Sequence, residues 1–361
     1  MRWRQRRRLN ALRQANPKGR AKKNWRSRSR NIARVPPVSL GREDARWLAA
    51  ASALAERARP LSSPNPGVGA IVVKDGLVVG RGWTQPGGRP HAEAIALEKA
   101  GESAHGATLY VTLEPCAHES ARGPACADLA AAAGLVRVVV GMADPDPRTA
   151  GSGVARIAQS GAEVITAGWS AEALSLSGHV ARTRLGRPHL TLKLALSLDG
   201  CIATAEGESR WITGAVARAH AHRERARADA ILVGGGTLRA DAPQLDVRLP
   251  GLEHRHPLRC VLSRGDAPVG WQAIGSPDAI DALENVRYLF VEGGAGAAAA
   301  LLAADMVDRL LIYRAPIVIG AGLPGLNDIG LTDLASTHHR WALDDTRQLG
   351  HDRLEIFTRT R

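Results

Sequence analysis

The sequence predicts an α/β protein made of two different domains. Apolar runs typical of strands alternate with segments of helical periodicity along most of the chain, which is the order typical of α/β folds. A length of 361 residues exceeds one ordinary domain, and an apolar content of 45% suffices for two hydrophobic cores. Gly186-Arg187-Pro188 separates two such alternations, and no internal repeat relates them. We therefore expect a first domain over residues 41–186 and a second over residues 187–361.

The first domain begins with apolar positions spaced about 3.6 residues apart, which predict a helix over residues 42–59. Two strands, at residues 67–73 and 77–82, flank Lys74-Asp75-Gly76, a sequence typical of a hairpin turn. Further along, the same criteria predict helices at 91–100, 124–133, 153–159 and 171–184, with strands between them at 108–113, 136–140 and 163–166.

The second domain repeats the alternation with different spacing. Strands are predicted at residues 189–196, 230–233, 286–291 and 310–315, and helices at 215–228 and 297–304.

The basic charge of the chain belongs to its first residues. Residues 1–34 hold 14 of the 48 Lys and Arg residues and no acid, which leaves 34 basic against 35 acidic residues elsewhere. Without apolar periodicity, residues 1–40 are predicted to be a disordered tail. The tail is interpreted as a solvated extension or an overlong translation start, with a start nearer Val38. A phosphate-binding arm aided by Trp3 and Trp25, and an organelle transit peptide, stay open as alternatives.

Other features of the sequence bear on where in the cell the protein is located. The apolar stretch at residues 295–304 stops at Asp305, well short of the roughly 18–20 residues that cross a bilayer. No apolar segment follows the basic N-terminus, so a secretory signal is not supported, and four cysteines do not make a disulfide scaffold. We expect a cytoplasmic enzyme without a membrane partner.

The strongest chemical signal is a set of three zinc-type ligands in the first domain. His91-Ala92-Glu93 opens a predicted helix, Pro115-Cys116 follows a strand, and Cys126 lies at the next helix start. One imidazole and two thiolates suit tetrahedral zinc and leave a fourth position for water, the arrangement typical of a catalytic site. Glu93 would act as the proton shuttle beside a water whose pKa zinc lowers toward about 7. The competing interpretation is two small buried thiols and a helix-start histidine.

These motifs, in the order strand, HAE helix, strand, PC helix, resemble the cytidine deaminase superfamily. Nine residues separate Cys116 from Cys126, and with the SPNP segment at residues 63–66 and TLEPCAH at residues 112–118 they are similar to the deaminase half of the bifunctional RibD family of riboflavin biosynthesis. In that family the stretch between the cysteines is typically one residue shorter, so the substrate contacts of this loop are not carried over. The resemblance implies a cytidine-deaminase-like α/β/α domain that removes an amino group from a pyrimidine.

Two glycine clusters follow predicted strands of the second domain, at residues 234–236 and 293–296. Such strand-to-helix turns can hold a phosphate through bare backbone amides, although they are also common as simple turns. Neither cluster has the G-x-G-x-x-G spacing of a Rossmann fold.

Four segments of this half, KLALSLDG (193–200), GESRWIT (207–213), residues 225–248 and residues 291–302, are similar to the reductase half of the same family. The resemblance implies a dihydrofolate-reductase-like α/β domain that uses NADPH. The implied NADPH contacts are Ala195, Trp211, Thr237, Asp241, Gly294, Ala295, Gly296, Ala297, Ala298, Ala299 and Ala300. The implied sugar-phosphate contacts are Ser209, Arg225, Leu245, Arg248 and Glu292.

One part of the second domain departs from the family pattern. Where the family commonly has Asp-Ser after a strand, this chain has Ser263-Arg264, and no cofactor contact is assigned there. Cys201 and Cys260 are expected to be buried structural thiols. The pairs His220/His222 and His338/His339 are expected to be exposed to solvent.

We therefore predict a bifunctional enzyme with zinc and NADPH as cofactors, phosphorylated pyrimidines as substrates and a homo-oligomeric assembly. It would deaminate 2,5-diamino-6-(5-phosphoribosylamino)pyrimidin-4-one and then reduce the ribosyl group of 5-amino-6-(5-phosphoribosylamino)uracil to ribityl. A nucleic-acid base deaminase that uses the basic arm is the first alternative, although it leaves the second domain without a role. A paralogue with one activity, or with only structural zinc, is the second alternative, and Glu93 argues against it.

Overall fold

The computed structural model describes residues 40–118, 120–147, 149–168 and 173–361. The predicted tail, residues 1–40, lies outside this part of the chain except for Leu40.

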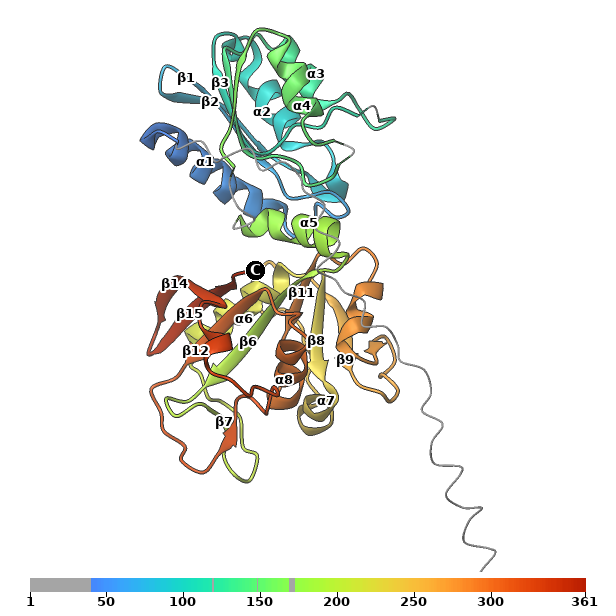
Figure 1. Ribbon diagram of the computed structural model, residues 1–361, viewed down its shortest axis with the longest axis vertical. Coiled ribbons are helices and arrows are strands. Elements are labelled where there is room, and N and C mark those ends of the chain that lie inside the picture. The colour runs from blue at the N-terminus through green and yellow to red at the C-terminus, as the bar shows by residue number, and fades with distance from the viewer. Residues whose placement is uncertain (1–39, 119, 148, 169–172) are drawn as a thin grey trace, which may run out of the picture. The chain divides into compact units, whose positions relative to one another are not determined.

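The first half of the described chain forms a five-stranded sheet in the order β2-β1-β3-β4-β5 (Figure 1). Its strands are β1 (Gly69–Lys74), β2 (Leu77–Trp83), β3 (Thr108–Leu113), β4 (Arg137–Met142) and β5 (Glu163–Thr166). β1 is antiparallel to β2 and β3, whereas β3, β4 and β5 are parallel. The helices are α1 (Arg42–Ala55), α2 (Ala92–Ala100), α3 (Cys126–Ala132), α4 (Ser152–Ala158) and α5 (Leu174–Leu185), with short 3-10 turns at Glu56–Ala58, Pro86–Gly88 and Gly101–Ala104.

Alternate residues of β1 reach two separate cores. Ala70 and Val72 pack with Ala96 of α2, whereas Ile71 and Val73 pack with Trp47 and neighbouring residues of α1. Successive side chains of a strand point to opposite faces, so a strand that is apolar at every position is covered on both sides. The first domain is therefore a three-layer α/β/α unit, as predicted.

The hairpin turn predicted at Lys74-Asp75-Gly76 is present. Asp75 and Gly76 both have positive φ values, 51° and 74°. Asp-Gly accepts this left-handed backbone at little cost, and its twist matches that of the two flanking strands.

The second half forms an eight-stranded sheet in the order β10-β9-β8-β11-β6-β12-β15-β14. Its strands are β6 (His189–Leu196), β8 (Ala230–Gly234), β9 (Leu258–Leu262), β10 (Gln272–Ile274), β11 (Tyr288–Val291), β12 (Arg309–Arg314), β14 (Trp341–Leu349) and β15 (Asp352–Arg359). The six strands from β10 to β12 are parallel, and β15 and β14 are added antiparallel. The helices are α6 (Ala215–Ala226), α7 (Gly235–Asp241) and α8 (Ala295–Ala303), with 3-10 turns at Pro277–Ala282 and Ala335–Thr337, and β7 (Cys201–Ala203) pairs with β13 (Leu323–Pro324).

Helices cover both faces of this sheet as well. Leu232 of β8 packs in one core with Ala298 of α8, and its neighbour Ile231 packs in the other with Ala221 of α6. Among the described residues, every strand and helix predicted for the second domain is present, with ends displaced by a few residues. The prediction omitted β7, α7, β9, β10 and the last three strands.

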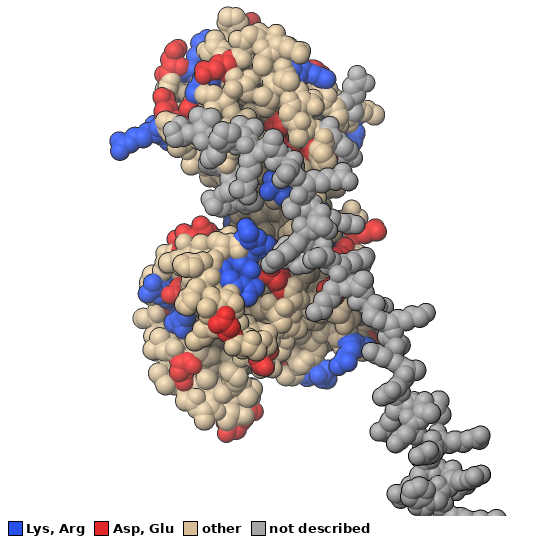
Figure 2. Space-filling model, in the orientation of Figure 1, with Lys and Arg blue, Asp and Glu red and all other residues tan. Residues whose placement is uncertain are grey.

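Charge on the folded part is mixed. Figure 2 shows basic and acidic side chains interspersed over the face that it presents. Of the helices in the described ranges, none is long and apolar enough to cross a membrane.

Two buried histidines of the second domain make its stability depend on pH. Burial lowers the pKa of both His189 and His220 to about 4, from an ordinary value near 6.5. Because the unfolded chain binds protons more readily, the stability these neutral rings contribute is complete above about pH 6.5 and is lost as pH falls toward 4.

We expect the free energy of unfolding to fall by a few kcal/mol, as an order of magnitude, between pH 6.5 and 4. Urea unfolding at several pH values, followed by circular dichroism, measures this slope. The double variant His189→Gln, His220→Gln should have a flatter profile across this window. An equally steep profile in the variant would show that other groups control the acid sensitivity.

Candidate active sites

The three predicted zinc ligands converge in the first domain. His91 lies at the N-cap of α2, Cys126 opens α3, and Cys116 follows β3. Nδ1 of His91 lies 3.3 Å from Sγ of Cys126 and 3.5 Å from Sγ of Cys116, and the three ligand atoms all lie within 4.8 Å of one another. Ligands about 2.0–2.3 Å from one zinc ion would be separated by such distances, so this donor set fits a tetrahedral zinc ion.

Glu93 is the buried carboxyl group beside this cluster. Its side chain is 3% exposed, and Oε2 has no hydrogen-bond partner among the described residues. Burial raises the pKa of Glu93, while the nearby His91 opposes the shift. A buried carboxyl group with one oxygen unpaired can take up and release a proton, which is the role that the sequence predicts for this residue.

The contact between the two thiols shifts their pKa values in opposite directions. The hydrogen bond from Cys126 lowers the pKa of Cys116 to about 3, with help from His91, although burial opposes this shift. The backbone N–H of Cys126 also donates to Cys116 Sγ, at 3.4 Å. The same contact with Cys116 raises the pKa of Cys126. These contacts favour the thiolate form of Cys116, the form that binds a metal.

Close packing positions the helix that carries His91 and Glu93. A Cβ atom on Gly82 of β2 would lie 2.3 Å from the carbonyl oxygen of Ala92, so only glycine lets α2 approach the strand this closely. The second ring nitrogen of His91, Nε2, lies 3.0 Å from Nδ2 of Asn65, in the SPNP segment. These contacts fix both the helix start and the direction of the imidazole ring.

Glu114 anchors the segment next to Cys116. Its buried carboxylate accepts hydrogen bonds from the backbone N–H groups of Asp144 (3.2 Å), Gly151 (3.0 Å), Gly153 (3.0 Å) and Val154 (3.3 Å). The carboxylate thus ties the loop after β4 and the start of α4 to the strand end that carries Cys116. Sequence analysis quoted this residue in a motif but gave it no role.

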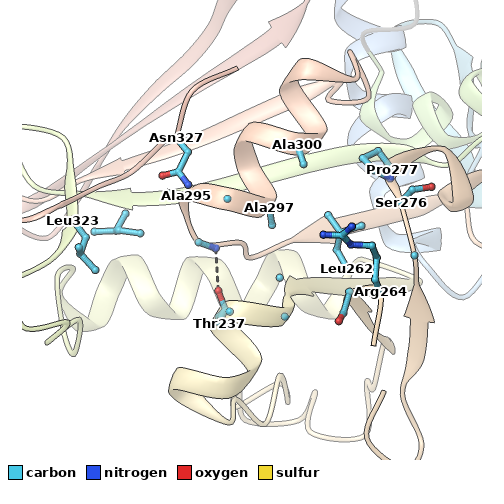
Figure 3. Close-up of a pocket in the computed structure, with 18 of the residues that line it drawn as sticks. Thr237, Leu262, Arg264, Ser276, Pro277, Ala295, Ala297, Ala300, Leu323 and Asn327 are labelled. Carbon is cyan, nitrogen blue, oxygen red and sulfur yellow. Dashed lines mark hydrogen bonds between the residues drawn. The ribbon is translucent and has the colours of Figure 1, made fainter. Parts of the chain in front are cut away.

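The second domain has a cavity of about 610 Å³ at the carboxyl ends of its parallel strands (Figure 3). The residues after β8 and β11 that line it are largely glycine and alanine, and Oγ1 of Thr237 accepts a hydrogen bond from the N–H of Gly294 at 3.1 Å. Open sheets bind ligands at this edge, and a lining without side-chain bulk lets phosphates approach backbone amides. The cavity therefore fits a dinucleotide.

Some of the predicted NADPH residues line this cavity, and others lie outside its lining. Its lining includes Thr237, Gly294, Ala295, Gly296, Ala297 and Ala300. Ala298 and Ala299 point into the core, so only their backbone could meet a ligand. Ala195, Trp211 and Asp241 are not part of the lining, and Trp211 is 64% exposed under the guanidinium of Arg218.

The predicted sugar-phosphate residues include one close ion pair. Arg225 binds both carboxylate oxygens of Glu292, and Lys193 Nζ lies 3.8 Å from Glu292 Oε2. Arg248 is exposed and bonded to Asp246 at 3.0 Å, whereas the side chain of Leu245 is buried in the core. Ser209 is half-buried in the loop before α6. Sequence analysis missed Lys193, although it lies in the KLALSLDG motif.

One expectation for the remaining residues was wrong. His220 is buried, and its Nδ1 lies 2.7 Å from the hydroxyl of Tyr313, because the inward face of α6 packs on β12. His222 is half-buried beside the Asp246 carbonyl. His338 and His339 are exposed, and Cys201 and Cys260 are buried, as expected.

Two family profiles match the chain, one for each half. Residues 42–142 match the zinc-binding region of cytidine and deoxycytidylate deaminases. Residues 188–269 and 276–354 match the RibD C-terminal domain. The two matches confirm the predicted pairing of a cytidine-deaminase-like domain with a reductase domain.

Relatives match across both halves together. The riboflavin biosynthesis protein RibD of Escherichia coli is 38% identical over 360 residues, covering 86% of this chain and 98% of the relative. RibD of Mycobacterium tuberculosis is 37% identical, with 81% and 90% covered. A solved deaminase/reductase structure from Thermotoga maritima has a TM-score of 0.77 at 30% identity, covering 88% of this chain and 99% of that one. RibD of Acinetobacter baumannii gives 0.75 at 33% identity, with the same coverage.

Proposed function

Because the chain belongs to the RibD family of bifunctional enzymes of riboflavin biosynthesis, we propose which residues carry each of its two reactions. One domain is a zinc-dependent deaminase and the other an NADPH-dependent reductase. We assign deamination to residues 41–186 and reduction to residues 187–361. The observation that carries the proposal is that one chain holds both the His91, Cys116 and Cys126 cluster and the glycine-lined cavity.

In the deaminase domain, His91, Cys116 and Cys126 hold the zinc ion and Glu93 moves protons. Bound zinc supplies an activated water at neutral pH. Glu93 would take up a proton from the attacking water and deliver one to the leaving amino group, so that water is consumed and ammonia is released. The carboxyl group suits this role because it is buried beside the cluster and its Oε2 atom has no hydrogen-bond partner among the described residues.

In the reductase domain, Thr237 and Gly294 to Ala300 hold the cofactor, and Ala195, Trp211 and Asp241, which lie outside the cavity lining, are further proposed contacts. Arg225, Arg248 and Glu292, with Ser209 and the backbone of Leu245, bind the sugar phosphate. A guanidinium can bind phosphate oxygens in pairs, and a carboxylate can accept bonds from ribose hydroxyls. Bound NADPH supplies a hydride to the opened ribose, and the side chains orient the sugar toward it.

The proposed substrates are 2,5-diamino-6-(5-phosphoribosylamino)pyrimidin-4-one for the first domain and 5-amino-6-(5-phosphoribosylamino)uracil for the second. Supplying the diaminopyrimidine phosphate and recording ammonia release and NADPH oxidation separately tests both steps. Ammonia release should proceed without NADPH, and NADPH oxidation should follow it. NADPH oxidation that does not depend on prior deamination would contradict the proposed order.

Arg248 gives a specific test of the sugar-phosphate assignment. We expect Arg248→Ala to raise the KM for the phosphorylated uracil substrate by about 10-fold, because a charged hydrogen bond to phosphate is lost. The KM for NADPH should not change. Arg255→Ala, which removes a half-buried arginine of a neighbouring turn, is the matched control. An unchanged substrate KM in Arg248→Ala would remove this residue from the site.

We also propose a cytoplasmic, homo-oligomeric enzyme that does not bind nucleic acid. A reducing compartment keeps Cys116 and Cys126 available as thiolates. The exposed edge strand β14 offers a surface for a second copy, and light scattering of the purified protein tests this. The nucleic-acid deaminase alternative is not favoured, because it gives no role to the matched reductase half.

A further inference from the structure

Four neighbouring strand ends form the floor of the cavity in the second domain. Across the sheet, β10, β9, β8 and β11 are adjacent and parallel. The lining residues that follow them are, in the same order, Gly275 to Pro277, Ser263 and Arg264, Gly234 to Thr237, and Gly294 to Ala297. An elongated ligand in this cavity therefore lies across the strand ends.

The position of the sugar substrate determines which end of the dinucleotide lies at each side of the cavity. This step rests on the function proposed above. Glu292 follows β11, Lys193 belongs to β6, and both lie on the β11 side of the cavity. The nicotinamide must reach the sugar there, and the small residues after β8 and β11 suit the pyrophosphate. The adenosine ribose is then left beside Ser263 and Arg264. Figure 3 shows Arg264, Ser276 and Pro277 on the opposite side of the cavity from Leu323 and Asn327.

Arg264 is the charged residue of the described lining, which contains no Asp or Glu. Within the described ranges, no residue forms a hydrogen bond or ion pair with its guanidinium. Ser263 lies next to the glycine turn, since a Cβ on Gly235 would lie 3.3 Å from Ser263 Oγ. Ser263 Oγ accepts a bond from the N–H of Gly265 at 3.1 Å, so its own hydrogen can be donated to a ligand.

The presence of Arg264 and the absence of Asp and Glu from the described lining distinguish a site for NADP from a site for NAD. Sites for NAD place a carboxylate against the ribose 2′-hydroxyl, whereas sites for NADP place an arginine where the 2′-phosphate lies. A carboxylate would repel the phosphate, and a guanidinium binds it with paired hydrogen bonds. We propose that Arg264, assisted by the Ser263 hydroxyl, binds the 2′-phosphate of the adenosine ribose and makes the reductase prefer NADPH to NADH.

The test measures direct binding of NADPH and NADH to the full-length chain, detected by the fluorescence of the reduced nicotinamide. We expect Arg264→Ala to raise the Kd for NADPH by about 10- to 100-fold and that for NADH by less than about 3-fold. Arg264→Lys, which keeps the charge but loses the paired geometry, should fall between wild type and Arg264→Ala. In wild type, 2′-AMP should displace NADPH better than 5′-AMP does, and Arg264→Ala should remove this difference.

Arg259→Ala is the matched control, because Arg259 lies on β9, the strand that precedes Arg264, but outside the cavity lining. Retained NADH binding shows that the pocket of each variant is folded. The proposal is overturned if Arg264→Ala weakens both dinucleotides equally or weakens neither. It is also overturned if the preference is removed instead by Arg239→Ala, at a residue of α7 whose Nη1 would lie 3.3 Å from a Cβ on Gly235. A wild-type chain that binds neither dinucleotide would refute the proposed reductase function itself.

Discussion

Replacing Glu93 with glutamine is expected to slow ammonia release by about 10²- to 10⁴-fold, the usual range for losing a positioned proton-transfer group. Glutamine has nearly the same shape but cannot take up a proton from water or give one to the leaving amine. Zinc content should stay the same, because His91, Cys116 and Cys126 are unchanged. NADPH-dependent reduction of the supplied uracil substrate should also be unaffected, and it serves as an internal control for folding.

Glu98→Gln is the matched control for this variant. Glu98 lies on the same helix, α2, but is exposed, so the substitution removes the same charge away from the metal cluster. Its rate of ammonia release should equal that of wild type. If Glu93→Gln released ammonia at the wild-type rate with zinc in place, Glu93 would not be the proton shuttle, and another group would have to be found.

Replacing Cys126 with serine is expected to remove both zinc and deamination. Cys126 is 1% exposed, and its sulfur lies against the Nδ1 atom of His91. A serine hydroxyl is a poor zinc ligand because it does not ionise at neutral pH, and two remaining ligands hold zinc weakly. We expect metal analysis to show zinc falling from about one atom per chain to background, with no measurable ammonia release.

Cys201→Ser separates this loss from a general effect of removing a buried thiol. Cys201 is also buried, but it lies in β7 of the second domain, where Sγ donates to the carbonyl of Gly320. This variant should keep its zinc and its deaminase activity, and both variants should retain reductase activity. Stoichiometric zinc in Cys126→Ser would show that the metal uses another donor.

Regular apolar patterns made the centre of each domain predictable. Strand β6, at His189–Leu196, has the predicted ends because leucine recurs at every second position and Pro188 precedes it. Strands β14 and β15 were missed because β14 is an edge strand whose residues are mostly exposed, so its sequence carries little apolar pattern. Edge strands depend on backbone pairing with a neighbour, which a local pattern does not reveal.

The two candidate sites differed in how much the sequence revealed. His91, Cys116 and Cys126 were predictable because metal-binding residue types at specific spacings carry the chemistry themselves. The position of Ser263 and Arg264 in the cavity lining could not be predicted, because it depends on strand β9 lying beside β8. Strand order is a property of the tertiary structure. His220 was misjudged for a similar reason, because Tyr313, which faces its ring, is 93 residues away in the chain.

The four hydrogen bonds accepted by Glu114 also bear on which part of the first domain can vary in sequence. All four come from the main chain, so they do not depend on which side chains lie between Asp144 and Gly151. Those side chains can be exchanged in a mutant library while the strand end carrying Cys116 stays in place, provided that proline, which has no N–H to donate, is kept from the four donor positions. The sequence of this loop can therefore change without rebuilding the metal centre.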